Sequence, residues 1–252
     1  MYFNELIFIG KKIMNVINIK NFIAGEFSGW KKAEVLWLAF CCAAVIILSI
    51  QMGDNVMGIL SAVTASLYTI IAGKGKVSCY LFGIINTILY GWISYKMRLY
   101  GEVMLNWGWY LPMMFVGFFC WNKRKTEKQV IRKTCLSPKG RGITAGASLA
   151  GIALYTLILQ MLNGRTPVLD SATTVLSVTA MILTVKRCIE QWVLWTIVNI
   201  LAIVMWLQVY LENGNSAASL LMWCMALANG IIFFITWRRE LEPEEREKCQ
   251  MD

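Results

Sequence analysis

Long apolar runs alternate along the chain with short segments that are polar and often basic. Eight of these runs approach or reach the length needed to cross a bilayer as a helix, which is about 20 residues. They cover 35–50, 55–73, 77–95, 103–121, 143–162, 170–185, 191–211 and 216–237. The pattern predicts an all-α membrane protein with eight transmembrane helices.

The runs 55–73 and 170–185 differ from the others because both contain several serines and threonines. Hydroxyl groups in membrane helices are typical of helix–helix interfaces, so we expect these two helices to pack inside the protein rather than face lipid on all sides. Asp54 and Asp170 stand at the starts of the same runs, where we interpret them as helix N-caps.

Lysine and arginine are divided unequally among the segments that separate the runs. If the N-terminus is cytoplasmic, 21 of these residues fall on the cytoplasmic side and 3 on the other side. Cytoplasmic segments are enriched in Lys and Arg, so both termini are predicted to be cytoplasmic. The main cytoplasmic parts are then the N-terminal segment 1–34, a basic loop at 122–142 and a charged tail at 238–252.

Polar and small residues recur at matching positions in the two halves of the chain. The matched pairs are Ser61 with Ser177, Asn86 with Asn199, and Gly117 with Gly230. They predict two parallel three-helix bundles, 55–121 and 170–237, connected by a linker helix at 143–162. This 3+1+3 arrangement leaves 35–50 as an additional N-terminal transmembrane helix. Repeats of this kind hold a substrate near the bilayer midplane, between the two bundles.

The composition narrows the possible classes of function. Hydrophobic residues make up 58% of the chain, charged residues make up 15%, and histidine is absent. The net charge of +9 comes from basic residues split among short segments, which argues against a nucleic-acid surface. The eight cysteines form no CxxC pair, and we interpret them as small buried hydrophobic residues. We therefore expect no metal site, no cofactor and no enzymatic activity.

One predicted helix carries aromatic side chains and an amide on a single face. Trp192, Trp195, Asn199 and Trp206 lie at i, i+3, i+7 and i+14, which is one stripe of an α-helix. An amide in the middle of a membrane helix needs a partner, so Asn199 should face the protein interior and is a candidate substrate ligand. The structural alternatives are an interfacial anchor for Trp192 and a helix–helix hydrogen bond for Asn199.

Further candidate substrate-binding residues are Asn86, Tyr90, Asn106 and Asn229. Asn86 is the repeat counterpart of Asn199, and Tyr90 lies one turn farther along the same helix. Asn106 and Asn229 are embedded amides in the third helix of each bundle. Each of these two could instead hydrogen-bond a neighbouring helix.

No Asp, Glu, Lys or Arg occupies the middle of any of the eight runs. Carriers that are coupled to ion gradients usually need such groups inside the membrane. The pattern therefore predicts uncoupled facilitated diffusion of a small polar solute by alternating access. Tryptophan faces also favour a flat or cationic ring, since a cation–π contact contributes about 0.5–2 kcal/mol.

Three features carry a resemblance to a known family: the spacing WxxWxxxN at 192–199, the run Leu99–Asn106 and the 3+1+3 repeat. In these features the chain resembles the PnuC family of bacterial nicotinamide riboside transporters, over roughly residues 50–240. The resemblance implies a SWEET-like fold, a homotrimer in the bacterial inner membrane, and passive uptake of nicotinamide riboside, an NAD precursor. A separate cytoplasmic nicotinamide riboside kinase would then retain the substrate by phosphorylation.

The same resemblance implies that Trp192, Trp195 and Asn199 contact the nicotinamide and ribose groups. The family run ends in a tyrosine where this chain has Trp206, so the aromatic face is kept and one hydroxyl is lost.

Other functions remain open at this point. Related transporters carry thiamine or riboflavin, and a sugar is a further possible substrate. A membrane-embedded enzyme would have only Ser, Thr and Cys to work with in its spans, because histidine and midspan carboxylates are absent. A receptor-like or structural subunit would use the basic loop as its partner surface, but that loop is more simply a cytoplasmic connector that meets anionic lipid headgroups.

Overall fold

The computed structural model describes residues 24–51, 53, 55–96, 100–126, 130–162, 166–213 and 217–250. Within these residues the chain is helical, and its only extended pairings are isolated bridges at Lys125–Ile131 and Thr134–Cys188. The helices are α3 (Lys32–Gln51), α4 (Val56–Gly73), α5 (Cys79–Lys96), α6 (Tyr100–Val103), the π-helical turn η1 (Met104–Tyr110), α7 (Leu111–Asn122), α8 (Pro138–Met161), α9 (Pro167–Val185), α10 (Glu190–Asn213), α11 (Ala217–Arg239) and α12 (Pro243–Lys248).

Several of these helices have the length and apolar composition that suit a hydrocarbon environment. Among the described residues, α3, α4, α8 and α9 are long and apolar enough to cross a membrane. Large side chains on α8 are widely exposed, including Leu149 at 68% and Leu154 at 63%. Surfaces of this kind are covered by lipid or by another protein. The chain is therefore a multi-pass helical membrane protein.

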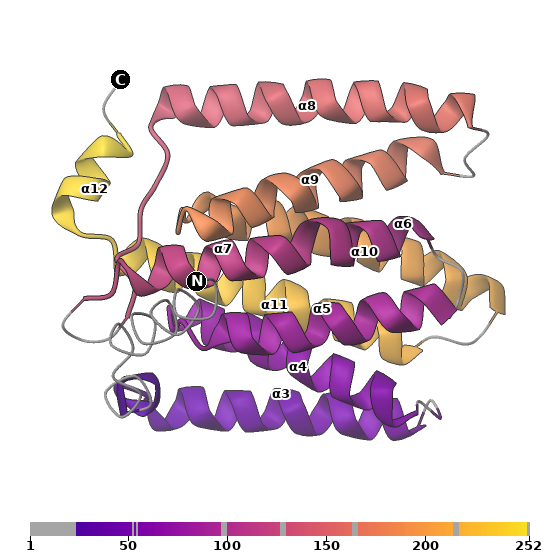
Figure 1. Ribbon diagram of the computed structural model, residues 1–252, viewed down its shortest axis with the longest axis horizontal. Helices are drawn as coiled ribbons and strands as arrows, with labels where there is room; N and C mark the ends of the chain where they lie inside the picture. Colours follow the sequence, from indigo (N-terminus) through magenta and orange to yellow (C-terminus); the bar gives the residue numbers. More distant parts are fainter. Residues whose placement is uncertain are drawn as a thin grey trace, which may run out of the picture.

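The long helices lie side by side, with α8 along one edge of the molecule and α3 along the opposite edge (Figure 1). In the first half, α5 packs between α4 and α7; in the second half, α10 packs between α9 and α11. The two halves meet where α7 packs on α9 and where α4 packs on α11. Helix α3 covers α4, and α8 covers α9. The third helix of each half thus packs on the first helix of the other half.

Tryptophans reinforce both of these contacts between halves. Trp121 of α7 donates an Nε1 hydrogen bond to the Thr184 carbonyl at the end of α9, at 2.9 Å. Trp237 of α11 donates to the Gly73 carbonyl at the end of α4, at 2.7 Å. Both indoles are fully buried, and their ring centroids lie 6.1 Å apart. Each indole therefore donates a hydrogen bond to one of the C-terminal carbonyls that have no partner within their own helix.

The described basic segments at 74–76, 123–126, 130–133 and 186–187 lie at one end of the molecule, where α12 also lies (Figure 1). Lys76 donates to the Gly25 carbonyl at 2.6 Å, and the Ile131 amide donates to the Gly75 carbonyl at 3.0 Å. The Thr134 amide reaches the Arg187 carbonyl at 3.0 Å. We call this part of the molecule, formed by 74–78, 123–126, 130–137, 186–189 and 240–250, the loop end.

The helix starts differ from the sequence prediction. Asn55 caps α4, and its side chain accepts from the Gly58 amide at 2.9 Å. Asp54 lies outside the described residues. Thr166, not Asp170, is the N-cap of α9, because Pro167 begins the helix at a position where no amide hydrogen is needed. Asp170 instead lies in the first turn and accepts from the Thr166 hydroxyl at 3.0 Å.

The cysteines are more varied than predicted. Cys41, Cys79 and Cys188 are buried, but Cys120 and Cys224 are exposed on outward helix faces. Cys135 and Cys249 form a disulfide, with Cα atoms 6.0 Å apart, although 114 residues separate them. The prediction of small buried residues is therefore wrong for Cys120 and Cys224, whereas Cys135 is buried at 2% exposed but paired with Cys249. The tail folds back onto the loop before α8, and no local pattern reveals such a contact.

Candidate functional site

Trp192 lies in the first turn of α10 and is only 4% exposed. Its ring centroid lies 5.2 Å from that of Phe233 and 5.6 Å from that of Trp237, both on α11. Its Nε1 has no hydrogen-bond partner among the described residues. Trp192 is therefore part of the aromatic core between α10 and α11, and its first role is packing.

Trp195 lies one turn deeper and is half-buried. Its Nε1 donates to the Thr184 hydroxyl at 3.3 Å, and that hydroxyl in turn donates to the Ala180 carbonyl at 2.9 Å. Since the Thr184 carbonyl also accepts from Trp121, this one residue connects α7, α9 and α10. The contact fixes the orientation of the Trp195 indole and leaves part of its surface open.

Asn199 lies two turns from Trp192 along the same face of α10 and is 7% exposed. Its side chain makes no hydrogen bond to any residue of the described part of the chain. Gly230 of α11 lies opposite it, so that a Cβ at position 230 would be 3.9 Å from Asn199 Nδ2 and 2.8 Å from the Thr196 hydroxyl oxygen. Glycine therefore keeps α11 close to this amide, and a buried amide without a protein partner is suited to bind a polar ligand.

Asn86, the repeat counterpart of Asn199, differs from it because its side chain is already hydrogen-bonded within the protein. Its Nδ2 donates to the Ser61 carbonyl at 2.8 Å and to the Ser61 hydroxyl at 3.2 Å. In the second half, Ser177 matches Ser61 in sequence but forms no hydrogen bond with Asn199 in the described part of the chain. Asn86 thus joins α5 to α4, whereas the equivalent pairing of Asn199 with Ser177 is not formed.

The two amides in the third helices are also satisfied by protein. Asn106 is 5% exposed, and its Nδ2 donates to the Glu102 carbonyl one turn earlier at 2.9 Å. Asn229 Oδ1 accepts from Trp37 Nε1 of α3 at 2.8 Å. Asn106 thus bonds back to the preceding turn of its own helix, and Asn229 joins α3 to α11.

Two candidates remain apart from this group. Tyr90 is 42% exposed at the surface of α5. The side chain of Trp206 lies outside the described residues. The close packing of α5 is on α4 and α7, and that of α10 is on α9 and α11, so α5 and α10 are not closely packed on each other.

The structure adds residues that the sequence did not single out as part of the site. Thr184 orients Trp195, and Gly230 keeps α11 close to the Asn199 amide. A threonine or glycine in an apolar run carries no distinguishing signal, since its role depends on what lies on another helix. The site that remains is the α10 face with Trp195 and Asn199, backed by Thr184 and Gly230. It offers an aromatic surface beside an amide, and within the described residues no cluster of metal-ligating side chains.

Comparisons with known proteins place the chain among membrane transporters. A family model described as nicotinamide mononucleotide transporter matches residues 55–239. The nicotinamide riboside transporter PnuC of Neisseria mucosa is 34% identical over 239 residues, covering 92% of this chain and 91% of the relative. The PnuC of Haemophilus influenzae is 32% identical over 216 residues, covering 84% and 92%.

A comparison with solved structures gives the same family as these relatives. The crystal structure of the vitamin B3 transporter PnuC matches with a TM-score of 0.75 and 35% sequence identity, covering 86% of this chain and 96% of that chain. The family model begins after α3, so the family match rests on α4 to α11. The chain belongs to the nicotinamide mononucleotide transporter family, whose members move solutes across membranes rather than convert them chemically.

Proposed function

We propose that this chain carries nicotinamide riboside across the bacterial inner membrane, with Trp195 and Asn199 in its substrate site. The observation that carries the proposal is Asn199, which is 7% exposed, whose side chain forms no hydrogen bond with the described residues, and which lies one turn from a half-buried tryptophan. Nicotinamide riboside has a positively charged aromatic ring, an amide and ribose hydroxyls. An indole face attracts the ring, and an asparagine can both donate to and accept from the polar groups. The names of the curated relatives support the same substrate.

The proposed architecture has eight spans in a SWEET-like 3+1+3 repeat, with bundles 55–121 and 170–237, the linker helix 143–162 and the additional helix 35–50. The packing supports this arrangement, because α7 packs on α9 as α11 packs on α4. Helix α3 also covers α4 as the linker α8 covers α9. Basic residues collected at the loop end favour an orientation with the segment 1–34, the loop 122–142 and the tail 238–252 in the cytoplasm.

The proposed mechanism is uncoupled alternating access between the two bundles. The reciprocal bonds from Trp121 and Trp237 close the loop end, so transport requires these contacts to break and re-form. No group in the site titrates near neutral pH, which suits a carrier that moves no proton. Net uptake then depends on removal of the substrate inside the cell, which a cytoplasmic nicotinamide riboside kinase would supply. The assembly we propose is a homotrimer.

Calorimetric titration of the purified protein in detergent tests the substrate. Nicotinamide riboside, thiamine and riboflavin are titrated in parallel, and we expect saturable heat from nicotinamide riboside alone. Saturation by thiamine or riboflavin instead would assign this transporter to another vitamin. Uptake into proteoliposomes tests the coupling: the rate should be the same with and without imposed proton or sodium gradients, and gradient-driven accumulation of unmodified substrate would disprove an uncoupled carrier.

A further inference from the structure

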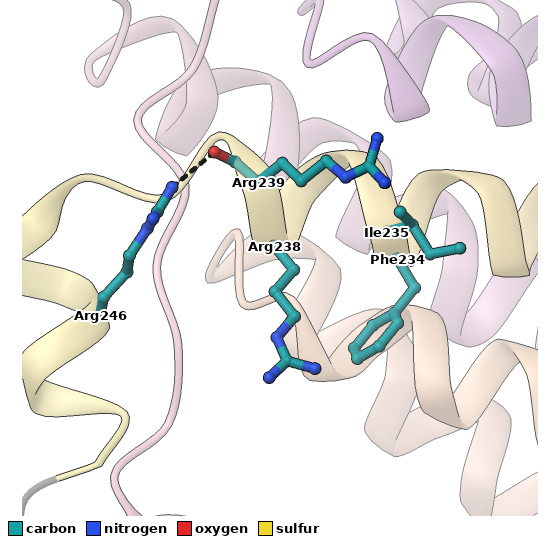
Figure 2. Close-up of a pocket in the computed structure, with 5 residues that line it drawn as sticks. All are labelled: Phe234, Ile235, Arg238, Arg239 and Arg246. Carbon is teal, nitrogen blue, oxygen red and sulfur yellow. Dashed lines mark hydrogen bonds between the residues drawn. The ribbon is translucent and has the colours of Figure 1, made fainter.

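The end of α11 forms a pocket that the transport function does not use. Its volume is about 430 Å³, and it is lined by Phe234, Ile235, Arg238, Arg239 and Arg246. Figure 2 shows these side chains, with Arg246 reaching across from α12 to the end of α11. Three of the five lining residues are arginines, which is an unusual concentration of positive charge for one small pocket.

Five glutamates, at 240, 242, 244, 245 and 247, lie close in sequence to the pocket arginines, but none of them forms an ion pair with these arginines. In the described part of the chain, no carboxylate lies within ion-pair distance of Arg238, Arg239 or Arg246, whereas six other basic residues at this end have one. Arg246 is held in place by backbone carbonyls: it donates to Arg239 at 2.6 Å and to Leu241 at 3.0 Å. An oriented guanidinium with free donors is suited to bind phosphate oxygens.

The apolar side of the pocket lies one helical turn from the arginines. Phe234 precedes Arg238 by four residues and Ile235 precedes Arg239 by four, so each apolar side chain lies beneath an arginine on the same helix face. Ile235 is 44% exposed, and Ile231, one turn farther along the same face, is 46% exposed. An apolar strip on α11 therefore leads away from the arginines toward the interior of the membrane.

We propose that this pocket binds the phosphate of an anionic membrane phospholipid, with an acyl chain along Ile235 and Ile231. The arginines end an apolar membrane helix, which places them at the depth of the headgroups. A soluble phosphate would use the arginines and leave the apolar strip uncovered, whereas a phospholipid occupies both. The lipid would also bridge α11 to α12, because Arg246 is contributed by α12.

Native mass spectrometry of the full-length protein tests the proposal, with phosphatidylglycerol and phosphatidylcholine offered in competition. The pocket variant is R238Q/R239Q. The matched control is K139Q/K186Q, which removes the same charge from two exposed lysines that have no ion pair and lie outside the pocket. We expect phosphatidylglycerol to bind the native protein and the control alike, and to bind the pocket variant roughly 10- to 30-fold more weakly.

A second variant separates loss of the site from loss of the fold. R238K/R239K keeps the charge and should retain most of the preference for phosphatidylglycerol, and thermal melting of all variants shows whether they are folded. Equal weakening in the pocket variant and the lysine control would mean that only the overall charge matters, and would overturn the proposal. Binding of inorganic phosphate or glycerol phosphate as strongly as the lipid would also overturn it, since the acyl chain would then contribute nothing.

Discussion

Asn86 and Asn199 occupy matching positions in two matching helices, yet their surroundings differ. Asn86 donates two hydrogen bonds to Ser61, whereas Asn199 makes none within the described part of the chain. Ser177, the sequence counterpart of Ser61, forms no such hydrogen bond with Asn199 within the described residues. Within the described residues, one amide is therefore paired with protein and the other is not.

Replacing each of these amides by leucine should separate the two roles. Asn199→Leu should abolish binding of nicotinamide riboside and leave thermal stability nearly unchanged, because no protein hydrogen bond is lost. Asn86→Leu should lower stability by about 1 kcal/mol, the usual value of a hydrogen bond between membrane helices, and should retain binding. Calorimetry and thermal melting measure the two effects. The reverse pattern would assign the substrate contact to Asn86.

The two tryptophans of the α10 stripe should also respond differently. Trp192→Ala leaves a cavity between α10 and α11 and should destabilise the protein by about 3–5 kcal/mol, as large-to-small changes in cores do. Trp195→Phe removes the donor to Thr184 and one ring of the indole, and should weaken binding with a much smaller effect on melting. If the Trp192→Ala variant has the same melting temperature as the native protein, then the packing of Trp192 with Phe233 and Trp237 does not stabilise the fold.

At the scale of elements, an apolar run predicts where the chain crosses the membrane better than it predicts whether the helix is α- or π-helical. The segment formed by α6, η1 and α7 is an example. The run 103–121 is one apolar stretch, but the helix widens to π-helical geometry over Met104–Tyr110. Pro112 lies in the first turn of α7 and lacks an amide hydrogen, so a regular hydrogen bond cannot form there. The Leu111 amide reaches back to the Asn106 carbonyl instead.

The reciprocal tryptophan bonds make a prediction about how the elements move. Trp121→Phe together with Trp237→Phe keeps an aromatic ring at each position and removes both donors to the ends of α9 and α4. We expect the loop end to open more often, which should raise the rate at which a thiol reagent labels the buried Cys79. Trp92→Phe, a change to an indole on the surface of α5, is the matched control. Unchanged labelling of Cys79 in the double variant would show that these bonds do not hold the loop end closed.

For the whole molecule, the distribution of basic residues predicts a topology that fusions can measure. The loop end brings together segments far apart in sequence, including Lys76, Lys133 and Arg187. With this end in the cytoplasm, a fluorescent protein fused to the C-terminus should fold and fluoresce, and alkaline phosphatase fused there should be inactive. Active phosphatase would place the tail on the opposite side and reverse the orientation.

The sequence by itself determined the membrane class, the approximate extents of the apolar helices and the family, because these depend on hydrophobic runs and on motifs local to one helix. It also pointed to α10 as the helix with Trp195 and Asn199. Only the tertiary structure decided which amides are already paired, that Trp192 belongs to the core, and that Cys135 meets Cys249. The physical reason is that a polar group in an apolar helix must find a partner, and that partner lies on another helix whose position no single helix encodes.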